Sequence, residues 1–174
     1  MRLNEAIALL PGDDFTGATS TQWADLGCGT GLFTTALAHL LMPGSTIYAV
    51  DSDATALASV PTHPSVTIQM VQGDFTQYSW SFPALDGILM ANSLHYVRDK
   101  TAFIQQATQH LIQTGRFLIV EYDTDAANRW VPYPVRYSAL EILFKNAGAS
   151  LVRKIAERPS RYNQGTMYSA LVEF

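Results

Sequence analysis

The chain has 174 residues, of which 48% are hydrophobic and 15% are charged. This length suits one domain, and the share of hydrophobic residues excludes an intrinsically disordered chain. Eleven basic and fifteen acidic residues give a net charge of −4, which disfavours a broad surface for nucleic acid. The single cysteine, Cys28, excludes an intrachain disulfide and a cysteine-based zinc site.

Residues 1–10 have an amphipathic pattern, with Leu3, Ile7 and Leu10 on one side of a short helix. They lack the basic start of a secretory signal, and no apolar run in the chain approaches the roughly 20 residues that span a membrane. We therefore expect a cytoplasmic protein with no membrane partner; the alternative is an N-terminal helix that lies on a membrane surface. We expect one domain, residues 1–174, with an N-terminal helix or lid segment at 1–20 and a core at 21–174.

Strand-like and helical patterns alternate along this core. In chain order, we expect a strand at 21–26, a helix at 30–42, a strand at 45–50, a helix at 53–60, strands at 66–71 and 85–91, a helix at 99–113, a strand at 115–122, a helix at 137–147, and strands at 150–156 and 167–174. This order predicts an α/β fold: a doubly wound, mostly parallel seven-stranded sheet with helices on both faces and an antiparallel edge strand (Rossmann-like). Ligands of such sheets bind beyond the carboxyl ends of the strands, so the residues that follow each strand are the candidates for a site.

The first strand and the first helix of the core are joined by a glycine-rich turn, Asp25-Leu26-Gly27-Cys28-Gly29-Thr30-Gly31. Small residues suit this position because the chain turns sharply and the N–H groups at the start of the helix can then approach a ligand. The Gly-x-Gly-x-Gly spacing differs from the Gly-x-Gly-x-x-Gly fingerprint of dinucleotide-binding folds. The turn therefore disfavours a nicotinamide cofactor.

Four segments occur in an order and spacing that are typical of one family: the glycine-rich turn, Val50-Asp51, Gly73-Asp74-Phe75, and the stretch from Asp86 to Val97. Over about residues 20–122 the chain resembles the class I S-adenosylmethionine-dependent methyltransferases, in particular the small-molecule methyltransferase-domain type. The resemblance implies S-adenosyl-L-methionine as the cofactor. It also implies a transferase that moves a methyl group to an O, N or C atom of a small-molecule acceptor.

The resemblance further implies roles for single residues. Asp25 would accept a hydrogen bond from the ammonium group of the cofactor, Asp51 would hold the two ribose hydroxyls, and Asp74 would accept from the adenine amino group. Each of these acids also has an ordinary alternative as a helix cap or turn residue. The expected cofactor-binding residues are Asp25, Gly27, Cys28, Gly29, Gly31, Asp51, Ser52, Asp74, Phe75 and Asn92.

Two residues after the fourth strand, His95 and Tyr96, are the catalytic candidates. Because a sulfonium methyl group is already activated, the protein mainly has to hold donor and acceptor close and in line. A general base is needed only if the acceptor must lose a proton, and His95 is the candidate for that role or for a polar wall of the acceptor pocket. A histidine that simply packs against the next helix is the alternative.

The segment 128–137 follows the fifth strand and combines prolines, which stiffen it, with large aromatic side chains. We expect Trp130, Tyr133 and Arg129 to contact the acceptor, with Arg129 or Arg136 holding a carboxylate or phosphate group. The alternative is a structured loop whose aromatic side chains fill the edge of the core.

Three acids, Glu121, Asp123 and Asp125, alternate at the end of the fifth strand. Carboxylates in this pattern can collect a divalent cation, but capping and turn roles are more ordinary, and we expect no metal site. Two other functions stay open: a non-catalytic module that binds S-adenosylmethionine, and an NAD(P)-dependent oxidoreductase on a similar sheet. The acceptor site is expected to be open, closed by residues 1–10, or completed by a second subunit in a homodimer.

Overall fold

The computed structural model describes residues 1–12, 17–77, 80–159 and 165–174. The strands are β1 (Gln22–Leu26), β2 (Thr46–Asp51), β3 (Thr67–Gln72), β4 (Leu85–Ala91), β5 (Leu111–Tyr122), β6 (Leu151–Pro159) and β7 (Thr166–Glu173). The α-helices are α1 (Leu3–Ile7), α2 (Leu32–Ala38), α3 (Ala54–Leu57), α4 (Lys100–Ala107) and α5 (Tyr137–Asn146). The short 3-10 helices are η2 (Phe75–Gln77), η3 (Leu94–Tyr96) and η4 (Thr108–His110).

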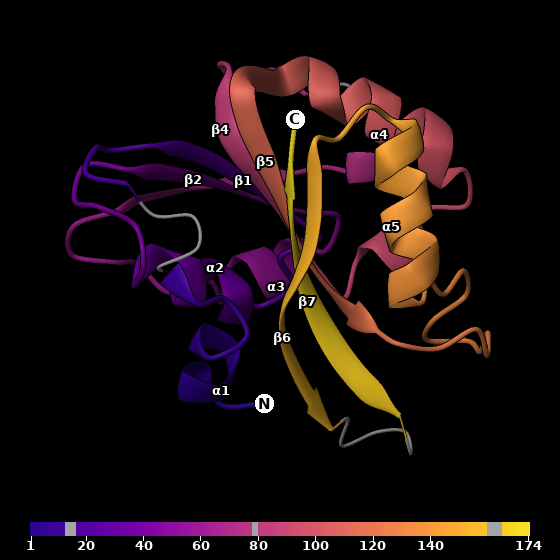
Figure 1. Ribbon diagram of the computed structural model, residues 1–174. Coiled ribbons are helices and arrows are strands. Elements are labelled where there is room, and N and C mark those ends of the chain that lie inside the picture. Colours follow the sequence, from indigo (N-terminus) through magenta and orange to yellow (C-terminus); the bar gives the residue numbers. More distant parts are fainter. Residues whose placement is uncertain (13–16, 78–79, 160–164) are drawn as a thin grey trace.

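The strands form one seven-stranded sheet in the order β3-β2-β1-β4-β5-β7-β6. Neighbours from β3 to β5 pair in parallel, whereas β7 is antiparallel to both β5 and β6. The last two strands therefore form the antiparallel edge of the sheet, with β7 inserted between β5 and β6 (Figure 1). These observations confirm the predicted fold class.

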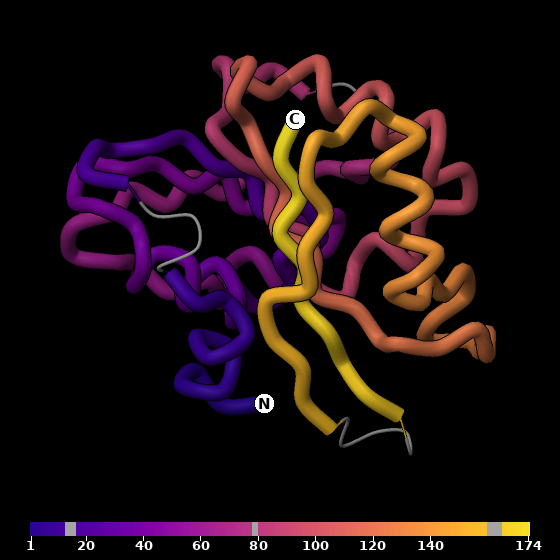
Figure 2. Tube along the Cα trace, viewed as in Figure 1, coloured from indigo at the N-terminus to yellow at the C-terminus, as the bar shows by residue number. Residues whose placement is uncertain are grey.

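Successive side chains of a strand point to opposite faces of the sheet, so a strand can place apolar residues on both faces. Helices cover both faces here. In β5, Phe117 and Ile119 pack in one cluster with residues of α4 and α5, whereas Leu118 and Val120 pack in another with residues of α1 and α2. Figure 2 shows the same two layers along the chain trace, with the N-terminal helices on one side of the sheet and α4 and α5 on the other.

The N-terminal helix packs against α2, where Ala6 and Leu9 are buried. Glu5 of this helix pairs with Arg158 of β6 at 3.0 Å, which ties α1 to the antiparallel edge. The lid role of residues 1–20 stays a prediction. Within the described part of the chain, no helix is long and apolar enough to cross a membrane.

The predicted helix at 99–113 is too long. The helix α4 ends at Ala107, and after η4 the strand β5 begins at Leu111. In the sequence, Leu111 continues the helical spacing of Phe103 and Ala107, but in the structure it pairs with Leu85 of β4. Pairing with a distant strand here outweighs the local helical pattern.

Gly87 in β4 lies directly against the indole ring of Trp23, which is 1% exposed. The substitution Gly87→Ala would drive a methyl group into that ring, and the packed core leaves the ring no room to move. We expect the free energy of unfolding, measured by urea titration, to fall by roughly 1–3 kcal/mol. Gly17→Ala is the control, since nothing lies within 4 Å of its added Cβ. Equal losses in the two variants would contradict this account of the packing.

Candidate functional site

A first cavity, of about 480 Å³, lies beyond the carboxyl ends of the parallel strands, and we call it cavity 1. The strand order reverses between β1 and β4, which is where ligands bind in doubly wound sheets. The residues that line cavity 1 are Gly27, Asp51, Ser52, Gly73, Asp74, Phe75, Thr76, Asn92, Ser93 and Tyr96.

Gly27 of the glycine-rich turn lines cavity 1, and the backbone of this turn requires glycine. Gly27, Gly29 and Gly31 have φ angles of 79°, 54° and 82°, and residues other than glycine rarely adopt such angles. A Cβ atom on Gly27 would lie 2.6 Å from Cβ of Ser93 and 3.1 Å from the Phe75 ring. The missing side chain of Gly27 therefore lets three segments meet at the wall of the cavity.

Asp51, the last residue of β2, lines cavity 1, and its carboxylate is oriented by two backbone groups. Its Oδ2 accepts a hydrogen bond from the N–H of Gly29 at 2.7 Å, and its Oδ1 accepts from the N–H of Asp53 at 2.9 Å. Each oxygen keeps a second lone pair for a further donor. Asp51 thus offers two fixed acceptor atoms at the edge of the cavity.

Asp25 lies beneath this region, 1% exposed, and is not among the described residues that line cavity 1. Its Oδ2 accepts a hydrogen bond from Oγ1 of Thr34 at 2.6 Å, whereas its buried Oδ1 has no hydrogen-bond partner. Burial raises the pKa of the Asp25 carboxyl from 3.8 to about 7; the nearby charge of Asp51 adds to the rise and the Thr34 hydroxyl opposes it. An unpartnered buried oxygen of this kind is suited to a donor that arrives with a ligand.

Asp74 follows β3 at the exposed end of cavity 1. Its Oδ1 accepts hydrogen bonds from the N–H and the hydroxyl of Thr76, the middle residue of η2. These bonds from Thr76 are the main reason that the pKa of Asp74 lies below its usual value. Asp74 is therefore a turn residue, which is the ordinary alternative that its sequence allowed. It also places a negative charge in the wall of cavity 1.

Asn92 follows β4 with a φ angle of 55°, the only positive φ of a residue other than glycine in the described chain. Its Oδ1 is buried without a hydrogen-bond partner. This unpartnered acceptor in the wall of cavity 1 is open to a donor of a bound ligand.

Six of the ten expected cofactor-binding residues line cavity 1: Gly27, Asp51, Ser52, Asp74, Phe75 and Asn92. The other four, Asp25, Cys28, Gly29 and Gly31, are not among its described lining residues. Cys28 packs against Ala49 and Val60, and burial raises the pKa of its thiol, so its surroundings are those of a packing residue. Sequence reasoning did not identify Gly73, Thr76 and Ser93 as lining residues.

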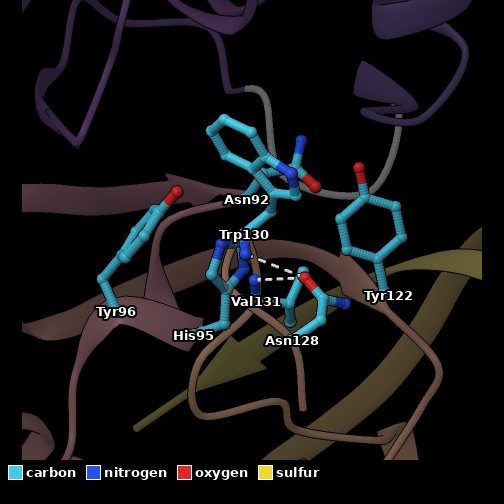
Figure 3. Close-up of a pocket in the computed structure, with 7 residues that line it drawn as sticks. All are labelled: Asn92, His95, Tyr96, Tyr122, Asn128, Trp130 and Val131. Carbon is cyan, nitrogen blue, oxygen red and sulfur yellow. Dashed lines mark hydrogen bonds between the residues drawn. The ribbon is translucent and has the colours of Figure 1, made fainter. Parts of the chain in front are cut away.

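A second cavity, of about 720 Å³, adjoins the first, and we call it cavity 2. Asn92 and Tyr96 line both cavities, so the two spaces meet at these side chains. The residues that line cavity 2 are Asn92, His95, Tyr96, Tyr122, Asn128, Trp130 and Val131 (Figure 3). Both catalytic candidates from the sequence, His95 and Tyr96, are among them.

His95 is held by Glu121, a partner that sequence reasoning did not identify. Nδ1 of His95 lies 2.8 Å from Oε2 of Glu121, and the N–H of His95 donates to Oε1 at 3.1 Å. Both side chains are almost fully buried, at 3% and 1% exposed. Because the carboxylate accepts, the proton is assigned to Nδ1, and Nε2 is left as the acceptor nitrogen of the ring.

The segment after β5 closes the opposite side of cavity 2. Oδ1 of Asn128 accepts from the N–H groups of Trp130 and Val131, which forms a tight turn and presents the Trp130 ring. The N–H of Tyr133 donates to the backbone oxygen of His95 at 3.0 Å, so this segment is attached to the loop after β4.

Of the three residues expected to contact the acceptor, Trp130 lines cavity 2, and Arg129 and Tyr133 are not among its described lining residues. The guanidinium of Arg129 lies over the Trp130 ring, 4.8 Å from its centroid. Nζ of Lys100 donates to the backbone oxygen of Tyr133 at 2.7 Å. Arg129 therefore packs on the wall that Trp130 forms, whereas Tyr133 is held through its backbone by Lys100 and His95.

The three acids that alternate after β5 have separate partners and do not converge. Glu121 holds His95, Oδ1 of Asp123 accepts from the N–H of Tyr137, and Asp125 pairs with Arg136 at 3.0 Å. In the described ranges, no group of three or more His, Cys, Asp or Glu side chains is arranged to hold a metal ion.

The fold is similar to that of several solved proteins. One is a SAM-dependent methyltransferase of Archaeoglobus fulgidus, with a TM-score of 0.75 at 13% identity over 100% of this chain and 95% of that chain. Another is the YcgJ protein of Bacillus subtilis, with a TM-score of 0.70 at 12% identity over 98% and 96% of the two chains. A third is the magnesium protoporphyrin IX methyltransferase of Synechocystis PCC 6803, which was solved with bound SAM. Its TM-score is 0.68 at 16% identity, over 97% of this chain and 77% of that chain.

At such identities these likenesses show the fold alone, and none of the curated proteins matches the chain. The family is shown by its sequence model. The model described as "Methyltransferase domain" matches residues 24–119, which is more than half of the chain and includes the glycine-rich turn and both catalytic candidates. The chain therefore belongs to the methyltransferase-domain family of enzymes, which confirms the family resemblance of its sequence motifs.

Proposed function

We propose that this enzyme is an S-adenosyl-L-methionine-dependent methyltransferase whose small-molecule acceptor loses a proton from the atom that is methylated. The observation that carries the proposal is the junction of the two cavities at Asn92 and Tyr96, with the His95–Glu121 pair in the wall of cavity 2. Cavity 1 holds the cofactor and cavity 2 holds the acceptor. We also retain the prediction of a cytoplasmic location.

The residues of cavity 1 fit the chemistry of this cofactor. Asp51 offers two oriented acceptors for the ribose hydroxyls, and Asp74 offers an acceptor for the adenine amino group. Asp25 and Asn92 each have a buried oxygen without a partner, which suits the donors of an ammonium group. When bound, S-adenosylmethionine supplies the methyl group as an electrophile and retains the electron pair of the broken S–C bond, so S-adenosylhomocysteine is the by-product.

His95 is proposed to receive the acceptor's proton. Its Nε2 carries no proton in the assigned tautomer, and the imidazole is a wall of cavity 2. As the acceptor oxygen, nitrogen or carbon forms its bond to the methyl group, its proton moves to Nε2 and later passes to water. The carboxylate of Glu121 stabilises the resulting imidazolium. Tyr96, which lines both cavities, is proposed to position the acceptor against the cofactor.

Two comparisons support the cofactor assignment. The solved protein of Archaeoglobus fulgidus is described as SAM-dependent, and the protein of Synechocystis was solved with bound SAM. A nicotinamide cofactor is disfavoured by the glycine spacing, and a purely cofactor-binding module would not need the buried histidine–glutamate pair beside a second cavity.

Asp51→Ala tests the cofactor site. The substitution removes both oriented acceptors, so we expect the affinity for S-adenosylhomocysteine, measured by calorimetry, to fall by about 1–3 kcal/mol, or roughly 5- to 150-fold. Asp53→Ala is the matched control, because Asp53 caps α3 and does not line cavity 1. NADH should give no binding heat with the wild-type protein. Unchanged affinity in Asp51→Ala, or binding of NADH in place of S-adenosylhomocysteine, would refute the assignment.

Binding of the cofactor should release protons from Asp25, and the number released should depend on pH. With its pKa raised to about 7, the carboxyl is mostly protonated at pH 6, and an ammonium group that binds nearby favours the charged form. We expect release of about one proton per S-adenosylhomocysteine at pH 6 and almost none at pH 8.5, where Asp25 is already ionised. Calorimetry in buffers of different ionisation enthalpy measures this number.

Asp25→Asn is the control for that measurement. It keeps an acceptor oxygen for Thr34 but cannot titrate, so the release at pH 6 should disappear. Equal proton release in the wild-type protein and in Asp25→Asn would show that another group is responsible.

A further inference from the structure

We infer that cavity 2 selects an uncharged, flat ring compound that presents a hydroxyl group, that is, an acceptor of the phenol type. The inference rests on the proposed function, because it names the substrate class of that same site. Three features of the cavity carry it: its aromatic walls, a described lining that contains no lysine or arginine, and the position of the His95–Glu121 pair.

Aromatic rings form most of the wall of cavity 2. Tyr96 and Tyr122 stand on opposite sides of His95 and Trp130 (Figure 3). The His95 ring lies 4.5 Å from the Tyr96 ring and 6.4 Å from the Tyr122 ring, measured between centroids. A flat aromatic ligand gains more binding free energy from such walls than a saturated ring of equal size, because ring stacking and edge contacts add to the burial of apolar surface.

No lysine or arginine is among the described residues that line cavity 2. Among its described lining residues, the only ionisable side chains are one histidine and two tyrosines. Arg129 is stacked on Trp130, Arg136 pairs with Asp125, and Nζ of Lys100 donates to two backbone oxygens.

An anionic acceptor would also face the carboxylate of Glu121, which is buried directly behind the His95 ring. A carboxylate or phosphate that entered cavity 2 would lose part of its hydration without meeting a lysine or arginine in the described lining. The site therefore favours a neutral acceptor over an acid of the same shape.

The kind of hydroxyl follows from what a neutral imidazole can deprotonate. A phenolic hydroxyl, such as that of tyrosine, has a pKa of about 10, whereas that of water is close to 16. Transfer of a proton to Nε2 of His95 as the methyl bond forms is therefore far easier for a phenol than for an aliphatic alcohol.

The volume of cavity 2 agrees with an acceptor of the phenol type. Cavity 2 has a volume of about 720 Å³, which lies within the range of pockets for small organic molecules. It accommodates a compound of two or three fused rings beside the cofactor.

Three matched probes test the inference: 2-naphthol, 6-hydroxy-2-naphthoate, which adds a carboxylate, and decahydro-2-naphthol, which removes the aromatic rings. Each is titrated by calorimetry into the protein saturated with S-adenosylhomocysteine. We expect 2-naphthol to bind at least about tenfold more tightly than either of the others. In a separate assay with S-adenosylmethionine, 2-naphthol should yield its methyl ether faster than either of the other two probes.

Trp130→Ala should weaken the binding of 2-naphthol by about 3- to 10-fold, because it removes one aromatic wall. The residue is 68% exposed, so the fold should tolerate the change. Ile142→Ala is the matched control: Ile142 is 62% exposed on α5, does not line cavity 2, and its replacement should leave the affinity unchanged.

The outcomes separate the inference from the proposed function. If the protein binds S-adenosylhomocysteine but binds the carboxylate or the saturated alcohol as well as 2-naphthol, or binds none of the three, the acceptor class is wrong and the cofactor assignment stands. If S-adenosylhomocysteine does not bind, the proposed function itself is wrong, and the inference fails with it.

Discussion

The buried carboxylate of Glu121 is the interaction on which the chemistry of this site depends. One of its oxygens accepts from the backbone N–H of His95 and the other from the imidazole, so it joins the end of β5 to the loop after β4. A carboxylate in the core persists only where its oxygens have donors, and here His95 supplies both. The pair therefore fixes the position of the ring and directs Nε2 away from Glu121 in the wall of cavity 2.

The sheet explains why these groups meet. Parallel strands carry their carboxyl ends to one edge, and the reversal of strand order between β1 and β4 leaves a crevice there. The glycine-rich turn lines this crevice because Gly27 lets Ser93 and Phe75 approach its backbone closely. Asn92, with its positive φ, stands where cavity 1, proposed for the cofactor, meets the aromatic cavity 2, proposed for the acceptor.

Much of this arrangement could be predicted from the sequence, because it depends on local patterns. The alternation of strand-like and helical patterns predicted the sheet, and the acids that follow its strands placed Asp51 and Asp74 at its carboxyl edge. What could not be predicted depends on contacts between distant segments. Glu121 is 26 residues from His95, and only the pairing of β4 with β5 brings them together. The same applies to Leu111, whose pairing with β4 ends a helix that its local sequence would continue.

The central claim is that Glu121 holds His95 with a free Nε2 that can receive the acceptor's proton. Nitrogen-15 NMR of the imidazole in the protein bound to S-adenosylhomocysteine tests it most directly, since the two ring nitrogens give different shifts in the two neutral tautomers. The account predicts that the neutral ring carries its proton on Nδ1 and leaves Nε2 bare. A neutral ring protonated on Nε2 would contradict it, because the nitrogen proposed as the base could then accept no proton.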